Sequence, residues 1–167
     1  VAEFTGPYTM RVGEEEISAD MILLCPGSRP AIPAIEGLED IEYLTSDTLL
    51  ELEELPRSLV IVGGGYIASE YGHFFSAMGS EVTVLGRNPQ FLPGEEPEVA
   101  AAARDMMSKH MQIRTNHEVV RVQSPKNRKV QVVARERETG QEKEIEAEHL
   151  LVATGRASNT DLLRVDR

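Results

Sequence analysis

The sequence predicts an α/β fold in three layers, with a parallel sheet and an antiparallel β-meander. The middle of the chain contains, in this order, a buried apolar run at 58–62, a glycine turn, a helical pattern from about 66 to 78 and a second apolar run at 81–85. This order makes a complete βαβ unit. From Val119 onwards the apolar period changes to two, which is typical of an antiparallel meander. Aromatic residues make up only 5% of the chain and tryptophan is absent, so we expect an aliphatic core, which suits a sheet covered by helices.

Length and charge limit the classes of protein that this chain can belong to. At 167 residues it suits one domain with a real core. The formal net charge of -11 repels phosphate backbones and anionic membrane surfaces, so we expect neither nucleic acid nor a membrane as a partner. No apolar run approaches the roughly 20 residues that span a bilayer, and no cleavable signal pattern is seen.

The single cysteine, Cys25, cannot form an internal disulfide and has no metal-ligand neighbours in the sequence. We therefore expect a reducing compartment, the cytoplasm, and a structural thiol that follows a buried strand. The first residue is Val1 rather than Met, which suggests processing or excision from a larger polypeptide.

The amino-terminal part of the chain indicates short strands and a connector. We expect a strand at 9–12, a hairpin turn beside Gly13 and a buried strand at 21–24. The segment 25–33 is dense in proline and glycine and predicts a loop, with a domain boundary near residues 30 to 55. Ser46-Asp47 can cap a short helix that continues to Leu55 and ends before Pro56.

After the βαβ unit the chain continues with a second helix and a series of strands. Pro97 opens a helix that extends to about His110, and Ile113 lies on the next short strand. The alternating pattern then predicts strands at 119–122, 129–135 and 142–146, followed by a last buried strand at 149–153.

The glycine turn carries the strongest functional signal. Residues 63–68, Gly-Gly-Gly-Tyr-Ile-Ala, fit the pattern G-x-G-x-x-G/A between a strand and a helix. The first glycine makes the tight turn, the second lets the backbone approach a pyrophosphate, and the small third residue lets helix and strand pack closely. The phosphate charge then meets the positive end of the helix dipole. We therefore expect a Rossmann-like dinucleotide-binding domain; the alternative is a glycine-rich turn with only a packing role.

Coenzyme choice is decided at the end of the second strand of the unit. A carboxylate about 20 residues beyond the fingerprint binds the ribose 2′-OH of NAD. This chain has Gly86 there, followed by Arg87, and the next acidic residue, Glu95, is too far along the loop. A guanidinium can pair with a 2′-phosphate, so these residues favour NADP. The alternative for Arg87 is an exposed loop charge.

Three motifs together resemble a known family. The segment GGGYIASE at Gly63–Glu70 is similar to the second nucleotide fingerprint of the class I pyridine nucleotide-disulfide oxidoreductases, which include dihydrolipoamide dehydrogenase, glutathione reductase and mercuric reductase. Two further segments, CPGSRPAIPAIEG at Cys25–Gly37 and LLVATGRASNT at Leu150–Thr160, are similar to the two ATG segments of that family. Cys25-Pro26 replaces a usual Ala-Thr, and Ala157 replaces a usual Pro.

The resemblance implies that this chain is the inserted NAD(P)-binding domain of such an enzyme with two edges of its flavin domain. Residues 1–55 are then the edge of the flavin domain and a connector, 56–155 the NAD(P)-binding domain, and 156–167 the return towards the flavin domain. The amino-terminal FAD fingerprint and the C-x-x-x-x-C redox motif do not occur in the sequence. NAD(P)H bound here would deliver hydride to FAD held by the missing parts of the polypeptide. The full-length enzyme would be a homodimer that reduces a disulfide or mercuric ion, and the isolated fragment would be inactive.

The resemblance also assigns roles to single residues. Those that would hold the pyrophosphate and the nicotinamide side are Gly63, Gly64, Gly65, Tyr66 and Ile67. Tyr66 resembles a ring that gates access to the flavin, and Glu70 a carboxylate near nicotinamide and flavin; the alternatives are a half-buried helix aromatic and a helix-surface charge. Val119 would pack near the adenine and Gly155 would approach the nicotinamide half. Gly27 and Ser28 belong to the first ATG-like segment, whose backbone approaches cofactor.

Several alternatives stay open. Within the family, NAD-using dehydrogenases carry Glu where Gly86 stands, whereas NADP users bring a second Arg where this chain has Pro93. A stand-alone dinucleotide sensor, a coenzyme A disulfide reductase and an NADH oxidase would share most of these motifs. A methyltransferase or other Rossmann-like enzyme is disfavoured by the paired ATG-like segments. We expect neither a metal site nor a catalytic side chain, because the four histidines, His73, His110, His117 and His149, lack ligand spacing.

Overall fold

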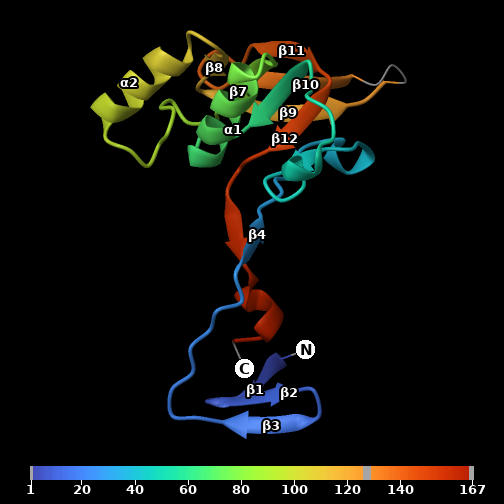
Figure 1. Ribbon diagram of the computed structural model, residues 1–167, viewed down its shortest axis with the longest axis vertical. Helices are drawn as coiled ribbons and strands as arrows, with labels where there is room; N and C mark the ends of the chain where they lie inside the picture. Colours follow the sequence, from blue (N-terminus) through green and yellow to red (C-terminus); the bar gives the residue numbers. More distant parts are fainter. Residues whose placement is uncertain (1, 126–128, 166–167) are drawn as a thin grey trace. The chain divides into compact units, whose positions relative to one another are not determined.

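The computed structural model describes residues 2–125 and 129–165 of the chain. The chain divides into two compact units, one formed by Val1–Arg29 with Arg156–Arg167 and the other by Pro30–Gly155. The second unit contains the βαβ pattern and is the larger of the two (Figure 1).

The larger unit is built on a five-stranded parallel sheet. Its strands, in the order β5-β12-β6-β7-β8, are β5 (Leu44–Thr45), β12 (His149–Val152), β6 (Ser58–Val62), β7 (Glu81–Leu85) and β8 (Gln112–Arg114). The helix α1 (Tyr66–Ala77) connects β6 to β7, and α2 (Pro97–Met107) lies between β7 and β8 in the sequence. The strands at 58–62 and 81–85 have the bounds that the apolar pattern predicts.

The antiparallel meander covers one face of this sheet. It consists of β9 (His117–Gln123), β10 (Val130–Glu136) and β11 (Glu142–Ala147), in the order β11-β10-β9. The expected α/β fold, Rossmann-like with a parallel sheet and an antiparallel β-meander, is therefore confirmed.

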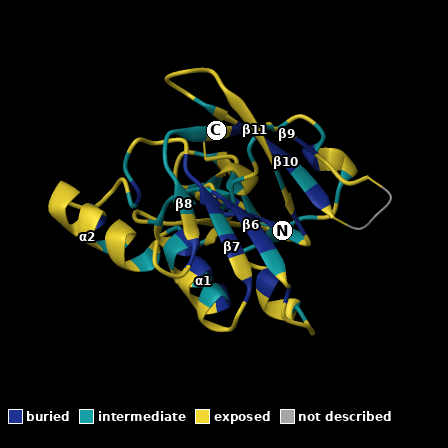
Figure 2. Ribbon diagram, turned by 90° about the horizontal axis from the view of Figure 1, so that it is seen from above, coloured by how far each residue is buried: buried dark blue, intermediate teal, exposed yellow. Residues whose placement is uncertain are grey.

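Strand β6 is apolar from Leu59 to Val62, because both of its faces are buried there (Figure 2). Val60 and Val62 belong to a core shared with the meander, whereas Leu59 and Ile61 belong to a core shared with α1. This alternation makes the three layers: helix, parallel sheet and meander.

Helix α1 approaches the sheet closely because it presents small residues to it. Ala68 is fully buried, and a Cβ on Gly72 would lie 3.6 Å from the Cδ1 of Ile61 and 2.9 Å from the Sδ of Met111. Gly79, with φ +104°, follows the helix and turns the chain into β7.

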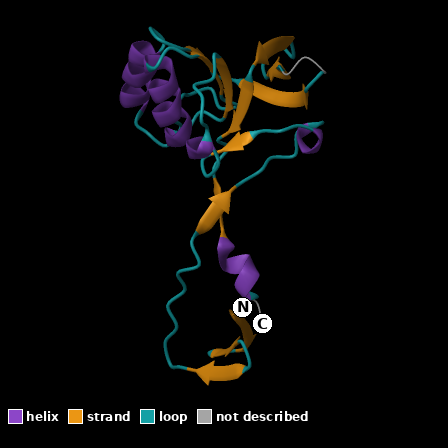
Figure 3. Ribbon diagram, turned by 45° about the vertical axis from the view of Figure 1, so that its right-hand side comes forward, coloured by secondary structure: helices purple, strands orange, loops and turns teal. Residues whose placement is uncertain are grey.

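The smaller unit contains a three-stranded antiparallel sheet and a two-stranded ladder (Figure 3). The sheet has the order β1-β2-β3, with β1 (Ala2–Gly6), β2 (Thr9–Val12) and β3 (Glu15–Ser18). The ladder pairs β4 (Ser28–Pro30) with β13 (Arg156–Ser158), and a 3₁₀ helix, η3 (Asn159–Leu163), follows it.

Ion pairs hold the smaller unit together, and one of them joins Arg11 to Glu3. Arg29 binds Asp161 with both terminal nitrogens, at 2.7 and 3.0 Å, and Arg164 pairs with Glu3 at 2.8 Å. The hydrogen bonds from Arg29 keep the pKa of the Asp161 carboxyl below its usual range, and they raise the pKa of Arg29.

The prediction of a buried strand at 21–24 is wrong. Met21 and Leu23 are each 88% exposed, and residues 21–24 form no strand. A buried strand needs a neighbour on each side, and the described part of the chain offers this segment none. Cys25, expected to follow a buried strand as a structural thiol, is exposed.

Other expected boundaries also need correction. The loop expected at 25–33 contains β4, because residues 156–158 return beside it. The helix expected up to Leu55 is a single 3₁₀ turn, η2 (Leu49–Glu51), whose N-cap is Thr48 rather than Ser46-Asp47. The Thr48 hydroxyl accepts instead from the backbone N–H of Thr45, at 3.0 Å. Helix α2 ends at Met107, three residues before His110, in a run of turns. A second 3₁₀ turn of the same length, η1 (Leu38–Asp40), completes the larger unit.

Within the described residues no helix has the length and the apolar character that crossing a membrane demands.

Candidate functional site

The site begins where β6 ends, at a glycine that no other residue can replace. Gly63 has φ +122°, and its N–H donates to the carbonyl of Leu85 at 2.9 Å. A Cβ at this position would lie 2.2 Å from the carbonyl oxygen of Ala153, at the end of β12. The chain therefore turns sharply out of the sheet, in close contact with the ends of two neighbouring strands.

The next glycine brings the loops after β6 and β7 together. A Cβ on Gly64 would lie 3.4 Å from the Cα of Gly86, and the Gly64 carbonyl accepts from the N–H of Leu92 at 2.7 Å. Gly86 is buried here, and its N–H donates to the carbonyl of Arg114 at 2.9 Å.

Gly65, the N-cap of α1, is open where the other two glycines are crowded. Its backbone is extended (φ -93°, ψ -168°), and no atom lies within 4 Å of the place that a Cβ would take. No side chain caps the helix, and its first turn holds no acidic residue. The N-terminal N–H groups of α1 are therefore free to bind an anion that approaches over Gly65.

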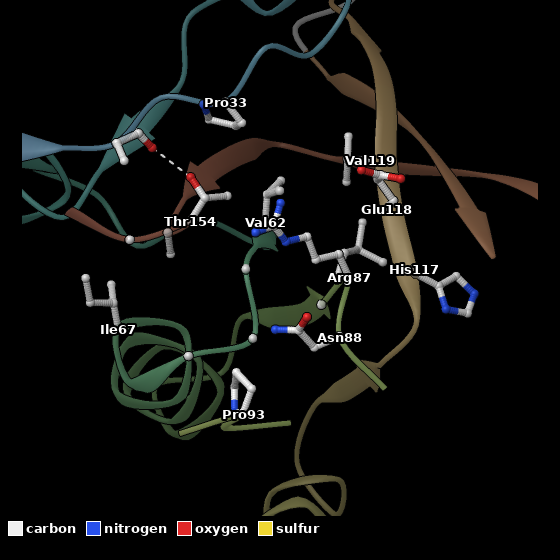
Figure 4. A pocket seen from close by; sticks show the side chains of 18 of the residues that line it. Pro33, Val62, Ile67, Arg87, Asn88, Pro93, His117, Glu118, Val119 and Thr154 are labelled. Atoms are coloured by element: carbon white, nitrogen blue, oxygen red, sulfur yellow. Dashed lines mark hydrogen bonds between the residues drawn. The ribbon is translucent and has the colours of Figure 1, made fainter. Parts of the chain in front are cut away.

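These loops line a pocket of about 560 Å³ at the carboxyl ends of the parallel strands (Figure 4). It brings together nine of the residues that the sequence singles out: Gly63, Gly64, Gly65, Tyr66, Ile67, Gly86, Arg87, Val119 and Gly155. Ligands of open α/β sheets bind in this crevice. The floor is apolar, since Ile67, Val62 and Val119 are buried in it, whereas Tyr66 at the rim is 61% exposed.

Arg87 is the cation of this pocket. Its side chain extends into the pocket (Figure 4), and among residues 2–125 and 129–165 no carboxylate pairs with it. It is therefore available for an anionic ligand. The opposing charge in the pocket is the exposed carboxylate of Glu118 on β9.

The sequence did not indicate one wall of the pocket. Residues 31–35, which follow β4, lie along it and are held by two hydrogen bonds: Ala31 N–H to the Gly155 carbonyl at 2.9 Å, and the Thr154 hydroxyl to the Ala31 carbonyl at 2.7 Å. Other lining side chains that the sequence did not single out as binding residues include Asn88, Gln90, Pro93, His117 and Glu118. The pairing of 31 with 154–155 joins segments far apart in the sequence, so local patterns carry no signal for it.

Three of the expected site residues lie elsewhere. Glu70 is exposed on α1 and lines a different, mostly apolar hollow with Tyr71 and Phe74. Gly27 and Ser28 belong to the smaller unit, where Gly27 has φ +72° and the Ser28 hydroxyl accepts from Nε of Arg156 at 2.8 Å.

A carboxylate at the end of the meander hairpin is strongly perturbed. Hydrogen bonds from the hydroxyl and the N–H of Thr139 lower the pKa of Glu136 to about 2, and the N–H of Glu138 and the Asn116 amide add to this effect. Across the described ranges, no three residues of the types His, Cys, Asp and Glu gather into a group that could hold a metal ion.

The fold and the pocket define a class of protein: an α/β domain whose glycine turn opens a helix beside the ends of parallel strands, as in nucleotide-binding proteins. Residues 2–167 match the family model described as pyridine nucleotide-disulphide oxidoreductase. The chain belongs to this family of oxidoreductases.

Curated relatives and solved structures agree with this assignment. The chain is 34% identical over 167 residues to a mercuric reductase of Staphylococcus aureus, covering 99% of this chain and 30% of the relative. It is 37% identical over 163 residues to mycothione reductase of Mycobacterium tuberculosis, covering 97% and 34%. A copper(II) complex of the HOCl-induced flavoprotein disulfide reductase RclA from Escherichia coli superposes with a TM-score of 0.82 at 32% identity, covering 99% of this chain and 37% of that one. The chain spans about a third of the length of these relatives.

Proposed function

We propose that the unit Pro30–Gly155 binds a nicotinamide dinucleotide, NAD(P)H, and presents it to FAD carried by other parts of a longer polypeptide. The observation that carries this proposal is the open backbone at Gly65. Over this glycine, the N–H groups that begin α1 meet a pocket with no protein atom in the way. When it is bound, the dinucleotide supplies the hydride.

The residues of the pocket fit such a ligand. Its volume of about 560 Å³ lies in the range of roughly 300–1,000 Å³ that is usual for small-molecule sites. The diphosphate would lie over Gly64 and Gly65, where a side chain would intrude. The adenosine half would extend towards Gly86, Arg87 and Val119.

The nicotinamide half would extend in the opposite direction, towards Ile67 and Gly155. The exposed ring of Tyr66 would lie over it as a gate that excludes water until flavin and dinucleotide meet. Glu70 lies outside this pocket, so its proposed place is on the side that faces the flavin.

We propose the division 1–55, 56–155 and 156–167, with the first and last parts as edges of the flavin domain. The exposed apolar side chains of Met21 and Leu23 support it, because they would be covered by a neighbouring strand of that domain. Gly27 and Ser28 would then approach the FAD. The whole enzyme would be a cytoplasmic homodimer. It would reduce a disulfide or mercuric ion, as the names of its relatives, mercuric reductase and mycothione reductase, suggest.

The test is Gly65→Val, a substitution that the fold tolerates at this position. The extended backbone suits valine and no atom lies within 4 Å of the new Cβ, so the protein should stay folded. A side chain that obstructs a packed contact costs about 1–3 kcal/mol, which corresponds to about a 5- to 150-fold loss of affinity for NADH and NADPH alike. Isothermal titration calorimetry measures the loss, and circular dichroism checks the fold.

Gly6→Val is the matched control, since Gly6 also has open space at its Cβ and belongs to the smaller unit. It should leave both affinities unchanged. A folded Gly65→Val protein with unaltered affinity for either dinucleotide would contradict the proposal.

A further inference from the structure

Three consecutive carbonyl groups of the loop after β7 are each held by a donor from a distant segment. The loop comprises residues 86–88, and its donors come from the turn before β9 and from the end of β10. The hydrogen bonds are His117 N–H to Gly86 O at 2.9 Å, Arg137 Nη1 to Arg87 O at 3.0 Å and Asn116 N–H to Asn88 O at 2.8 Å. Every carbonyl of the loop that carries Arg87 is therefore fixed.

Arg137 is the only one of these donors that is a side chain. Its own backbone is fixed too, because its N–H donates to the carbonyl of Asn116 at 2.9 Å. The bond to Arg87 O places the Arg137 guanidinium directly beside the loop. In the described part of the chain this is the only hydrogen bond of the Arg137 side chain, so four of its five N–H donors are left for a ligand or solvent.

The carboxylate next to Arg137 in the sequence does not neutralise it. Glu136 accepts four hydrogen bonds, three from donors of its own hairpin and one from the Asn116 amide. Its oxygens therefore bind these groups and not Arg137. Neither Arg87 nor Arg137 forms an ion pair with any carboxylate of the described residues. Arg137 therefore brings a second positive, unpaired charge to the backbone of Arg87, 3.0 Å from its carbonyl oxygen.

We propose that Arg137 is a positioning and specificity residue that selects a dinucleotide with a phosphate on the adenosine 2′ oxygen. It fixes the loop from which Arg87 reaches the pocket, and it adds a second positive charge beside it. A phosphate monoester carries a charge of about -1.5 to -2 at neutral pH, which two guanidinium groups match and one does not. The inference rests on the proposed dinucleotide site.

The probes are adenosine 2′,5′-bisphosphate and adenosine 5′-monophosphate, which differ only in the 2′-phosphate. Calorimetric titration of the 167-residue chain should show tighter binding of the bisphosphate. Arg137→Ala should weaken bisphosphate binding about tenfold or more, the effect of losing one charge-assisted hydrogen bond. It should change binding of the monophosphate by less than about twofold.

Two further variants separate positioning from charge. Arg137→Gln keeps a donor for the Arg87 carbonyl without the charge, so its bisphosphate affinity should lie between those of the wild type and the alanine variant. If Arg137 acts partly through Arg87, the double variant Arg87→Ala/Arg137→Ala should lose less than the product of the two single fold-losses. The glutamine variant also serves if the alanine variant fails to fold.

Arg135→Ala is the matched control, because Arg135 lies two residues before Arg137, on β10, and pairs with Glu142 at 2.7 Å. It removes the same charge without touching the loop. The inference is overturned if Arg135→Ala equals Arg137→Ala in effect, if Arg137→Ala leaves the ratio of the two affinities unchanged, or if the wild type binds both probes equally. A wild-type chain that binds neither probe nor NADH and NADPH would overturn the proposed function itself.

Discussion

Single residues decide the shape of the glycine turn, and two neighbouring glycines do so for opposite reasons. At Gly63 both the backbone dihedral and the oxygen of Ala153 exclude a side chain. At Gly65 the protein itself excludes nothing. Gly63 is therefore required for the fold, whereas Gly65 is required only if a ligand binds over it.

Gly63→Ala should destabilise the protein by at least about 2 kcal/mol, because it combines left-handed strain with a steric overlap. Gly65→Ala should change stability by less than about 1 kcal/mol, since the backbone there is extended. Urea unfolding followed by circular dichroism compares the two variants. Equal stability of both would mean that the turn relaxes, contrary to the rigid contact with Ala153.

Arg87→Ala should weaken NADPH binding by about 1.5–3 kcal/mol, the range for a hydrogen bond to a charged group, and should leave NADH binding nearly unchanged. The effect should shrink at high salt, because Arg87 is exposed. Titrations with both coenzymes at two salt concentrations measure this. Equal losses for the two coenzymes would assign Arg87 to the pyrophosphate or to support of the loop.

Gly86→Glu should shift preference towards NADH, because it places a carboxylate where a ribose 2′-OH is bound in this fold. A Cβ there meets the Cα of Gly64 at 3.4 Å, an ordinary contact, so the variant should fold. The ratio of the NADH and NADPH dissociation constants is the measurement. A folded variant that still prefers NADPH would count against this position as the site of coenzyme choice.

The sequence predicts some of the pocket residues and misses others for one physical reason. Gly63, Gly65 and Arg87 follow strands within a local pattern, so spacing alone brings them to the same edge of the sheet. Arg137 reaches that edge only through the pairing of β9 with β10, a contact that local periodicity does not encode.

At the scale of elements, the hairpin that joins β10 to β11 is held by one ionised carboxylate. Glu136 accepts from the Thr139 hydroxyl at 2.5 Å and from its N–H at 2.7 Å, closing the turn, and from the Asn116 amide at 2.9 Å. Asn116 itself has φ +60°. The hairpin and the turn before β9 are therefore coupled through a single side chain.

This coupling should depend on pH. The pKa of Glu136 is lowered from 4.5 to about 2 in the folded protein, so its contribution to stability is complete above about pH 4.5 and is lost as the pH falls towards 2. Glu136→Gln should therefore be less stable than the wild type at pH 6, and the difference should narrow by pH 3. Chemical denaturation of both proteins between pH 6 and 3 measures it. A constant difference would mean that charge is not what the carboxylate contributes.

An apolar pattern in the sequence identifies a β-strand only when a neighbouring strand pairs with it. The runs that became β6 and β7 lie in the interior of the parallel sheet, and their ends were predicted to the residue. The run at 21–24 is also apolar, but it has no partner strand among the described residues and is not itself a strand. β5, two residues long, was missed because it exists only through pairing with β12.

At the scale of the whole molecule, the fold class and the family were predictable because three motifs in the right order define them together. The division into Val1–Arg29 with Arg156–Arg167 and Pro30–Gly155 depends instead on contacts between the two ends of the chain, such as Arg29 with Asp161. Such contacts have no counterpart in a local pattern.

The purified chain should bind dinucleotide but hold no FAD and show no reductase turnover. The reason is that the proposed flavin site needs sequence beyond the third of the relatives' length that this chain spans. An absorption spectrum and an NADPH oxidation assay with lipoamide or mercuric ion check this. A yellow preparation, or oxidation of NADPH with either acceptor, would show that the chain carries more of the enzyme than proposed.

The hydrogen bond between Ala31 and Gly155 fixes the second and the last residues of the larger unit next to each other. A chain that leaves a host protein at one end of this unit returns at almost the same point. For the host, the whole unit is then topologically equivalent to a short surface loop, and its removal or exchange leaves a gap that a tight turn can close. If the unit is the inserted coenzyme-binding domain proposed above, its replacement in one recombination event would leave the domain around it unchanged.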